Sequence, residues 1–255
     1  MHRRTGRKMM RILVPGSCSS ARSRPGIRRP RTGDRISPFT ARRGTIVIYS
    51  RSPRGSMARV MIVKEGEAWR EGEIWHAFPT TVLIESNGRK VLVDPGNHPS
   101  LLEFLERRSV WKEDIDMIFA THHHPDHTMN IGWFPGVPVV DGEYVYEETR
   151  ISPHSGRIPG TDIDVIPTPG HSPEHASLLV RSPEASTVIC GDLIWWTRDE
   201  APFTDREWFM GHPDEFAEDP EQLARSRERV LSLEADIHIP GHGKPFMMKE
   251  NPRDP

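Results

Sequence analysis

The sequence has few cysteines, no long apolar run and almost no acidic residues in its first 56 positions. Its two cysteines, Cys18 and Cys190, lie far apart, which does not favour a disulfide framework and leaves a reducing, cytoplasmic compartment as the expectation. No apolar run approaches the ~20 residues that a membrane-spanning helix needs, so we expect no membrane partner. The length of 255 residues, 35% of them hydrophobic, suits one large domain or two small ones.

Charge divides the chain into two parts. Residues 1–56 hold fifteen Lys and Arg side chains against one acid, Asp34, whereas residues 57–255 hold 19 basic and 35 acidic side chains. The basic part is also rich in Ser, Pro and Gly, and it cannot bury enough apolar surface to offset its ordering entropy. We therefore predict a basic, disordered extension over residues 1–56 and a folded catalytic domain over residues 57–255.

Three interpretations of the basic extension stay open. In the first it has no folded role, and translation begins at Met57 or Met61. In the second it is an arm that binds nucleic acid, because clustered Arg side chains neutralise phosphates. In the third it is a transit peptide, since such peptides are rich in Arg and poor in acids.

The apolar pattern after residue 57 predicts strands that alternate with helices. Two β-branched segments, 80–85 and 90–94, flank Asn87-Gly88, which is typical of a hairpin turn. An apolar stripe predicts a helix over residues 99–107. The further expected elements are strands at 115–121, 163–167, 176–181, 187–190 and 237–239, and a helix at 220–234.

Seven potential metal ligands follow these expected strands. The densest set lies in the segment Thr121–His127, where four histidines and an aspartate occupy seven positions. Zinc prefers imidazole and carboxylate ligands, and seven donors are too many for one tetrahedral ion but suit two ions that share a carboxylate. A metal at such a site lowers the pKa of a bound water to ~7. The seven donors are His122, His124, Asp126, His127, His171, Asp192 and His242.

Together with one further aspartate, these donors form five motifs in the order found in a known family. The motifs are Val93-Asp94-Pro95-Gly96, the His122–His127 cluster, Thr168-Pro169-Gly170-His171, Cys190-Gly191-Asp192 and Pro240-Gly241-His242-Gly243. Over about residues 75–246 the chain resembles the metallo-β-lactamase-fold hydrolase superfamily. Within it, the segments around Glu218–Leu231 and Pro240–Phe246 are similar to the compact single-domain group around metallo-β-lactamase domain-containing protein 1.

The resemblance implies a fold and a ligand set. The implied fold is α+β, a four-layer αβ/βα sandwich. The implied cofactor is two zinc ions per chain, with iron or manganese as alternatives. His122, His124 and His171 would hold the first metal, Asp126, His127 and His242 the second, and Asp192 would bridge them. Asp94 would support the site from behind, and His175 is expected to support it rather than to bind metal.

The implied reaction is hydrolysis of a small ester, thioester or lactone, with Asp126 as the catalytic residue that orients the attacking hydroxide. Asp192 stands where common zinc lactamases have cysteine, which disfavours lactam cleavage, and His124 stands where oxygen-reducing diiron members have glutamate. Two alternatives stay open. One is a phosphodiesterase or endoribonuclease, with RNA as partner in place of a small molecule, and the other is a mononuclear iron sulfur dioxygenase. The sequence says nothing of oligomeric state.

The remaining histidines and aromatic residues have simpler interpretations. His123 alternates away from the ligands and is expected to be packed or solvated, and Cys190 is expected in the core. His76 and His212 are candidates for lining a pocket, whereas His238 is expected to be structural. An aromatic-rich stretch after Asp192 predicts either a wall of the substrate cleft or a cover over the core; it consists of Trp195, Trp196, Phe203, Trp208 and Phe209.

Overall fold

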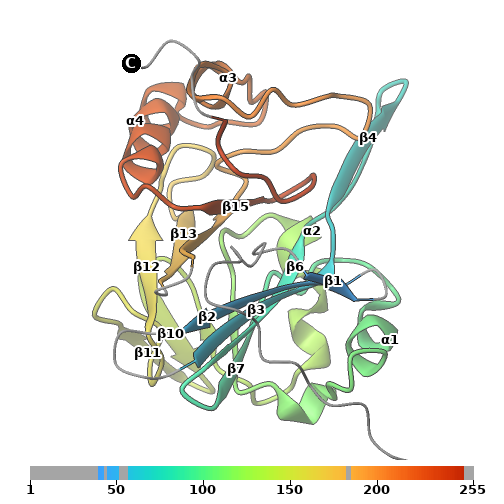
Figure 1. Cartoon of the computed structure of the whole chain (residues 1–255). Helices are drawn as coiled ribbons and strands as arrows, with labels where there is room; N and C mark the ends of the chain where they lie inside the picture. Colours follow the sequence, from blue (N-terminus) through green and yellow to red (C-terminus); the bar gives the residue numbers. More distant parts are fainter. Residues whose placement is uncertain (1–39, 43–44, 52–56, 182–184, 250–255) are drawn as a thin grey trace, which may run out of the picture. The chain divides into compact units, whose positions relative to one another are not determined.

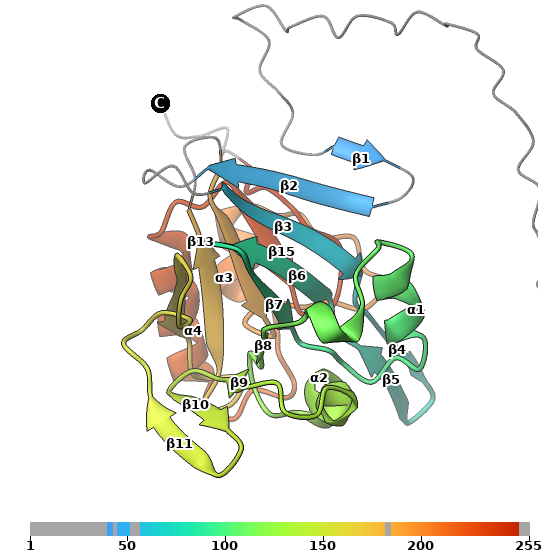
Figure 2. The same ribbon diagram turned by 90° about the horizontal axis from the view of Figure 1, so that it is seen from below.

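Two β-sheets form the centre of the fold. The computed structural model describes residues 40–42, 45–51, 57–181 and 185–249. The larger sheet has the strand order β1-β2-β3-β6-β7-β8-β9-β10-β11, which can be followed in Figure 2, and the smaller sheet has the order β12-β13-β14-β15. The larger sheet comprises β1 (Thr40–Arg42), β2 (Thr45–Arg51), β3 (Met57–Lys64), β6 (Thr81–Ser86), β7 (Arg89–Val93), β8 (Met117–Phe119), β9 (Val139–Val140), β10 (Tyr144–Glu147) and β11 (Arg150–Pro153). The smaller comprises β12 (Ile163–Pro167), β13 (Ala176–Val180), β14 (Thr187–Gly191) and β15 (Ile237–Pro240).

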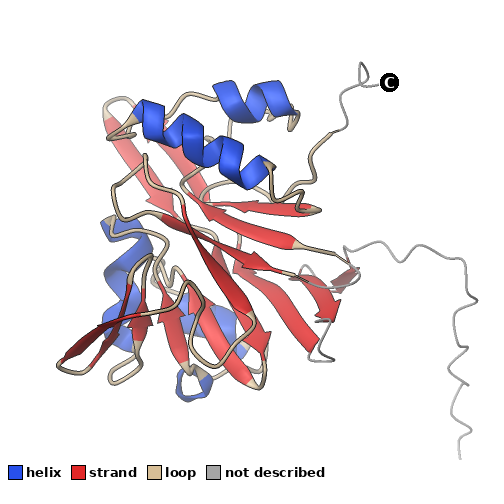
Figure 3. Ribbon diagram, turned by 90° about the vertical axis from the view of Figure 1, so that its left-hand side faces the viewer, coloured by secondary structure: helices blue, strands red, loops and turns tan. Residues whose placement is uncertain are grey.

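Helices cover the outer face of each sheet (Figures 1 and 3). Helix α1 (Leu101–Glu106) packs on the larger sheet, and α3 (Arg206–Gly211) and α4 (Pro220–Leu231) pack on the smaller one. The short helix α2 (Pro125–Thr128) and the 3-10 helices η1 (Lys112–Asp114) and η2 (Met129–Trp133) lie in the connections around β8. The order helix, sheet, sheet, helix confirms the predicted α+β fold, a four-layer αβ/βα sandwich.

Alternation along the strands builds three apolar layers from this arrangement. In β3, Val60 and Ile62 face the core between the sheets, whereas Met61 and Val63 face α1. In β13, Leu179 faces α4, while its neighbours in the strand face the core between the sheets. Successive strand side chains point to opposite faces, so a strand buried on both sides needs a continuous apolar run.

Most elements expected from the sequence are present with small changes at their ends. Asn87 and Gly88 both have positive φ angles, 51° and 76°, as a two-residue hairpin turn between β6 and β7 requires. Helix α4 begins after Asp219, whose carboxylate accepts a hydrogen bond from the Gln222 backbone N–H. Strand β8 is shorter than the predicted segment 115–121 because residues 120–124 already form the loop that carries the histidines.

A second hairpin was not expected from the sequence. Strands β4 (Glu67–Glu71) and β5 (Ile74–Phe78) pair with each other in a separate two-stranded sheet. Their charged residues and scattered aromatics hide the period-two pattern of a strand. Figure 1 shows this hairpin rising towards the loop that follows β14, and the Arg198 backbone N–H donates to the carbonyl of Ala68 across that approach.

The structure describes only part of the predicted basic extension over residues 1–56. Strands β1 and β2 lie before the expected boundary at residue 57 and continue the larger sheet by pairing with each other and with β3. Residues 1–39, 43–44 and 52–56 lie outside the described residues, so the extension over residues 1–56 and the domain over residues 57–255 stay predictions. None of the helices in the described residues is long and apolar enough to span a bilayer.

Arg227 fastens α4 to the segment between β14 and α4. Its side chain is 3% exposed, and its guanidinium donates to the carbonyls of Leu193, Met210 and His212. Burial lowers the pKa of Arg227 to about 10, so the group is still charged at neutral pH. A buried cation is costly unless its donors are satisfied. Backbone carbonyls satisfy Nε and Nη1 of Arg227, whereas Nη2 is buried without a hydrogen-bond partner.

We expect Arg227→Met to destabilise the protein by about 2–4 kcal/mol, because three buried carbonyls lose their donor. Urea denaturation followed by circular dichroism measures the change. Arg225→Met is the matched control on the same helix: Arg225 is exposed and pairs with Glu221 one turn away, and its loss should cost less than about 0.5 kcal/mol. Equal destabilisation by the two variants would contradict this role.

Candidate metal site

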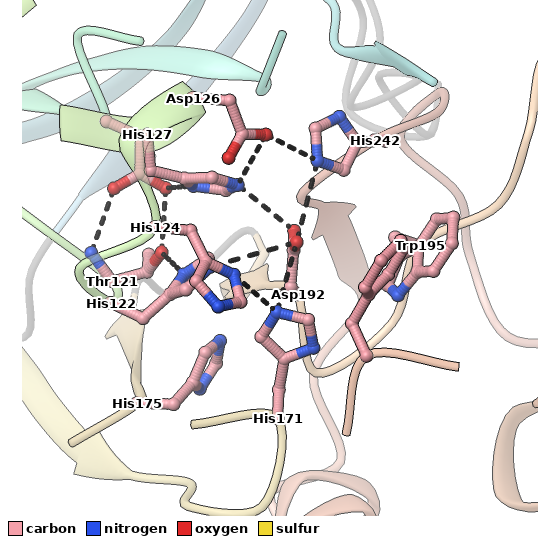
Figure 4. A network of polar contacts seen from close by, with 12 residues as sticks. Thr121, His122, His124, Asp126, His127, His171, His175, Asp192, Trp195 and His242 are labelled. Atoms are coloured by element: carbon pink, nitrogen blue, oxygen red, sulfur yellow. Dashed lines mark hydrogen bonds and ion pairs between the residues drawn. The ribbon is translucent and has the colours of Figure 1, made fainter. Parts of the chain in front are cut away.

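The seven predicted ligands come together at one edge of the two sheets (Figure 4). Parallel pairing of β7 with β8 and of β14 with β15 places the ends of these strands side by side, and the loops that leave them converge. His171 reaches the same place from the loop after β12. Residues from both halves of the chain are therefore needed to form the site.

A first group of donors is built around His124. His124 Nδ1 lies 3.0 Å from His122 Nε2 and 3.0 Å from His171 Nε2. Asp192 Oδ2 completes the group at 3.5 Å from His171 Nε2 and 3.8 Å from His122 Nε2. The edges of a tetrahedron of zinc ligands at about 2.1 Å from the metal measure about 3.4 Å, so these spacings suit one tetrahedral ion.

A second group consists of Asp126, His127 and His242. Asp126 Oδ2 lies 3.4 Å from His242 Nε2 and 3.7 Å from His127 Nε2. Asp192 also reaches this group, with Oδ1 3.3 Å from His127 Nε2 and Oδ2 3.5 Å from His242 Nε2. The two groups thus share the carboxylate that the sequence predicts as a bridge.

The second ring nitrogen of four of these histidines has a hydrogen-bond partner. His122 Nδ1 lies 3.1 Å from Thr121 Oγ1, and His242 Nδ1 lies 3.0 Å from the carbonyl oxygen of Phe78. His127 Nδ1 and His171 Nδ1 each face a carboxylate. A proton on Nδ1 satisfies each of these acceptors and leaves the Nε2 lone pair directed at the group, which is the tautomer that a metal needs.

Asp94 holds the histidine loop in place from behind. Its carboxylate accepts hydrogen bonds from the backbone and hydroxyl of Thr121 and from His127 Nδ1, at 2.8, 2.8 and 2.9 Å. Its φ angle of 44° is uncommon for a residue other than glycine. These bonds fit the supporting role predicted for Asp94. His175 also lies behind the group, with its ring centroid 5.3 Å from that of His122 and its Nδ1 bonded to Thr168.

Asp214 supports the site in a similar way and was not found from the sequence. Its buried carboxylate accepts from His171 Nδ1 at 2.7 Å through one oxygen, and from Trp195 Nε1 and the Phe216 backbone N–H through the other. Asp214 follows no strand and belongs to none of the five motifs, so the sequence offers no signal for it. The contact links a predicted metal ligand to an aromatic side chain.

The buried charges of the two groups control each other. Burial raises the pKa of Asp192, but His127 and His242 outweigh it and bring that pKa well below its ordinary value. Burial lowers the pKa of His242, but Asp192 and Asp126 outweigh it and raise the pKa to about 9. Burial and then the charge of His127 lower the pKa of His122 well below 6.5. The ionised Asp192 carboxylate is therefore stabilised by positive charge on the histidines around it.

Two of the potential ligand atoms have no hydrogen-bond partner within the protein. His127 Nε2 and Asp192 Oδ1 are buried and have no hydrogen-bond partner, although they lie 3.3 Å apart. Unpartnered buried polar atoms are rare and costly, and coordination of a cation would satisfy both. An imidazole and carboxylate set of this kind suits zinc, and it is also compatible with iron or manganese.

Gly241 allows the loops after β14 and β15, neighbouring strands of the smaller sheet, to pack closely around the shared carboxylate. A Cβ atom at this position would lie 1.7 Å from Asp192 Oδ1. The backbone N–H of Gly241 donates to the carbonyl of Gly191, the residue before Asp192. A larger residue at position 241 would push the carboxylate away from both groups.

A cavity of about 260 Å³ opens over the two groups. Asp126, which is predicted to be catalytic, faces into it and is about a quarter exposed. The other lining residues are Ala68, Trp75, Ala77, His124, Pro125, His171, Asp192, Trp195, Phe216 and His242.

The aromatic stretch after Asp192 divides between cavity and core. Trp195 lines the cavity, whereas Trp196, Trp208 and Phe209 pack with the core cluster beneath α3 and α4, and Phe203 is exposed. Cys190 is buried in the same cluster, as expected. Trp75 and Phe216 line the cavity but were not expected there.

The other histidines among the described residues do not line this cavity. His76 stacks on Trp69, and His212 packs against Trp208. The side chain of His123 is 53% exposed and contacts Asp141. Neither His76 nor His212 lines the cavity over the two donor groups, where the sequence made them candidates.

Comparison with known proteins gives consistent matches. Residues 76–242 match the family model described as the Metallo-beta-lactamase superfamily. Metallo-beta-lactamase domain-containing protein 1 of Mus musculus is 34% identical over 177 residues, which cover 65% of this chain and 64% of the mouse protein. Hydroxyacylglutathione hydrolase of Klebsiella pneumoniae is 32% identical over 137 residues, which cover 50% of this chain and 49% of that enzyme.

Solved structures share the fold. The structure of AidC, a dizinc quorum-quenching lactonase, covers 82% of this chain and 95% of its own chain with a TM-score of 0.55 at 15% identity. The chain spans less than two thirds of the length of the mouse protein that it matches.

We expect Asp214→Asn to weaken zinc binding about 10- to 100-fold. The single amide oxygen of Asn would accept from Trp195 and Phe216, so its NH2 group would face His171 Nδ1 and could neither accept the proton there nor fix the tautomer of the ring. Competition with a zinc chelator measures the affinity. Glu215→Gln removes the neighbouring exposed acid and should leave the affinity unchanged. Loss of affinity in both variants would point to general electrostatics instead.

Zinc binding at pH 7 should release protons. Against the effect of burial, Asp192 and Asp126 raise the pKa of His242 to about 9, so below that pH zinc must displace its proton. The pKa values of His127 and His171 are raised as well, which adds to the release. Apparent affinity should therefore rise with pH and level off above about pH 9. Calorimetry in two buffers of different ionisation enthalpy measures the release, and a release that does not fall as the pH rises would contradict the expectation.

Proposed function

Because the chain belongs to the metallo-beta-lactamase superfamily and is homologous to metallo-beta-lactamase domain-containing protein 1 at 28–34% identity, we propose that it is a dinuclear zinc hydrolase of a small ester, thioester or lactone. Named relatives in this superfamily are hydrolases, and the chain is a metal-dependent hydrolase of that superfamily with a candidate His and Asp site. One observation carries the finer proposal: two donor groups share Asp192 beneath a single cavity.

The site residues divide the work of hydrolysis between them. Bound zinc would supply a Lewis acid that polarises the substrate and lowers the pKa of water to about 7. Burial raises the pKa of Asp126, but His242 and His127 outweigh it and lower that pKa, so the carboxylate is ionised at neutral pH. Facing the cavity, Asp126 orients the attacking water and accepts its proton.

The bond changes balance without a further reactant. The water oxygen bonds to the acyl carbon, the C–O or C–S bond to the leaving group breaks, and the proton held at Asp126 passes to the departing alkoxide or thiolate. The protein itself supplies no covalent nucleophile in this scheme. Cys190 is fully buried in β14, and burial raises the pKa of its thiol far above the ordinary value.

The cavity favours a small neutral substrate over the alternatives. Among the described residues no Lys or Arg lines it, whereas binding to a phosphate backbone depends on such cations. A phosphodiesterase or endoribonuclease is therefore less well supported. A mononuclear iron dioxygenase would leave the group of Asp126, His127 and His242 without a role. A cytoplasmic location and a small-molecule partner remain part of the proposal.

Purified protein loaded with zinc should hold about two zinc ions per chain and should hydrolyse at least one member of an ester, thioester and lactone panel. His124→Ala should lower kcat/KM by at least about a hundredfold without unfolding the protein, because it removes the donor at the centre of the first group. His123→Ala is the matched control, since that side chain points away from the site, and it should keep its activity.

Metal analysis and steady-state kinetics test both expectations. A single iron per chain with consumption of oxygen, or full turnover by the His124 variant, would refute the proposed function.

A further inference from the structure

The cavity over the donor groups has one continuous aromatic wall. Trp75, Trp195 and Phe216 come from three separate segments, yet their ring centroids lie 5.5 to 6.1 Å apart. Trp75 meets the other two rings edge to face, at 80° and 73°. Such pairs hold one another in fixed orientations, so the wall is a preformed surface rather than a set of independent side chains.

The wall adjoins both donor groups. The Trp195 ring centroid lies 6.2 Å from that of His242, and its Nε1 donates to Asp214, the carboxylate that also bonds His171. Figure 4 shows Trp195 beside Asp192, His171 and His242. A group packed against this wall therefore lies next to the space above Asp192 in which the scissile carbonyl would react.

Apart from the donor groups and the wall, the described residues that line the cavity are small and apolar, and none of the described lining residues is a Lys or Arg. Ala68 and Ala77 pair across the β4–β5 hairpin, and Ala77 lies on the same strand face as Trp75, so their small side chains leave room beside the wall. Pro125 also lines the cavity. The volume of about 260 Å³ is below the range of about 300–1,000 Å³ typical of drug-sized ligands. One aromatic ring with a short linker fits this space, whereas a phosphate headgroup away from the donor groups would find no Lys or Arg among the described lining residues.

We infer that the wall of Trp75, Trp195 and Phe216 binds the acyl part of the substrate, and that this acyl part carries an aromatic ring. After cleavage the acyl part becomes a carboxylate beside the donor groups, whereas the alcohol or thiol leaving group departs from the cavity. This inference rests on the proposed hydrolase function and adds the chemical class of its substrate.

Thioesters of one thiol, N-acetylcysteamine, with different acyl groups test the inference on the zinc-loaded protein. The kcat/KM for the phenylacetyl thioester should exceed that for the acetyl thioester roughly tenfold or more. Trp75→Ala should reduce this ratio roughly tenfold. Phe216→Ala removes a partly exposed ring of the same wall and should also reduce the ratio, so it replaces the Trp75 variant as the test if that variant fails to fold. A wild-type enzyme that prefers acetyl, or equal rates with phenylacetyl and cyclohexylacetyl groups, would overturn the inference.

Trp69→Ala is the matched control. Trp69 lies on the same hairpin but stacks on His76 and does not line the cavity, so its loss should leave the ratio unchanged. An equal loss of selectivity in this variant would overturn the assignment to the wall.

Calorimetric titration with phenylacetate and acetate separates this inference from the proposed function. Phenylacetate should bind the zinc-loaded protein roughly tenfold more tightly than acetate, and Trp75→Ala should abolish the difference. If this holds while the whole panel of esters, thioesters and lactones is left uncleaved, the wall stands and the hydrolase proposal fails. If thioesters are cleaved but phenylacetate binds no better than acetate, the hydrolase proposal stands and the aromatic class is wrong.

Discussion

The burial of one carboxylate, Asp192, is the constraint on which the rest of the site depends. Both of its oxygens contact imidazole nitrogens, and its side chain is almost fully enclosed. A buried negative charge without compensation would cost several kcal/mol. The surrounding histidines must therefore be protonated, or metal ions must bind between them and the carboxylate. Gly241 is needed because any side chain there would occupy the place of the carboxylate. Burial of the Asp192 carboxylate thus requires both positive charge around it and a glycine at position 241.

The two sheets contribute unequally to that balance. The loop after β8 supplies donors to both groups, whereas the smaller sheet supplies the shared carboxylate and the donors that close each group. Hydrogen bonds behind the ligands follow the same division, with Asp94 holding the loop of the larger sheet and Asp214 holding His171. Correct packing of the core between the sheets is therefore a condition for metal binding as well as for stability.

Local features of the sequence were enough to predict much of this structure. His122, His124, Asp126 and His127 lie within one short segment, and each motif directly follows a strand, so chain geometry alone brings them to a sheet edge. Apolar runs likewise predicted β6, β7, α1 and α4. Asp214, Trp75 and Phe216 could not be found in this way, because their roles depend on contacts between segments far apart in the chain. The β4–β5 hairpin was missed for a different reason: charged residues and scattered aromatics hide the period-two pattern of its two strands.

Asp214 also ties two properties together that are usually considered separately. One of its oxygens bonds His171, and the other bonds the indole of Trp195. A mutation that shifts Trp195 to admit a different molecule would also move the acceptor behind a histidine of the first group. Evolutionary change of selectivity in this protein would then proceed more readily through Ala68 and Ala77 of the hairpin, because Trp75 packs directly on Trp195. Ala68 and Ala77 are the positions of the cavity at which sequence divergence between homologues should leave the metal chemistry undisturbed.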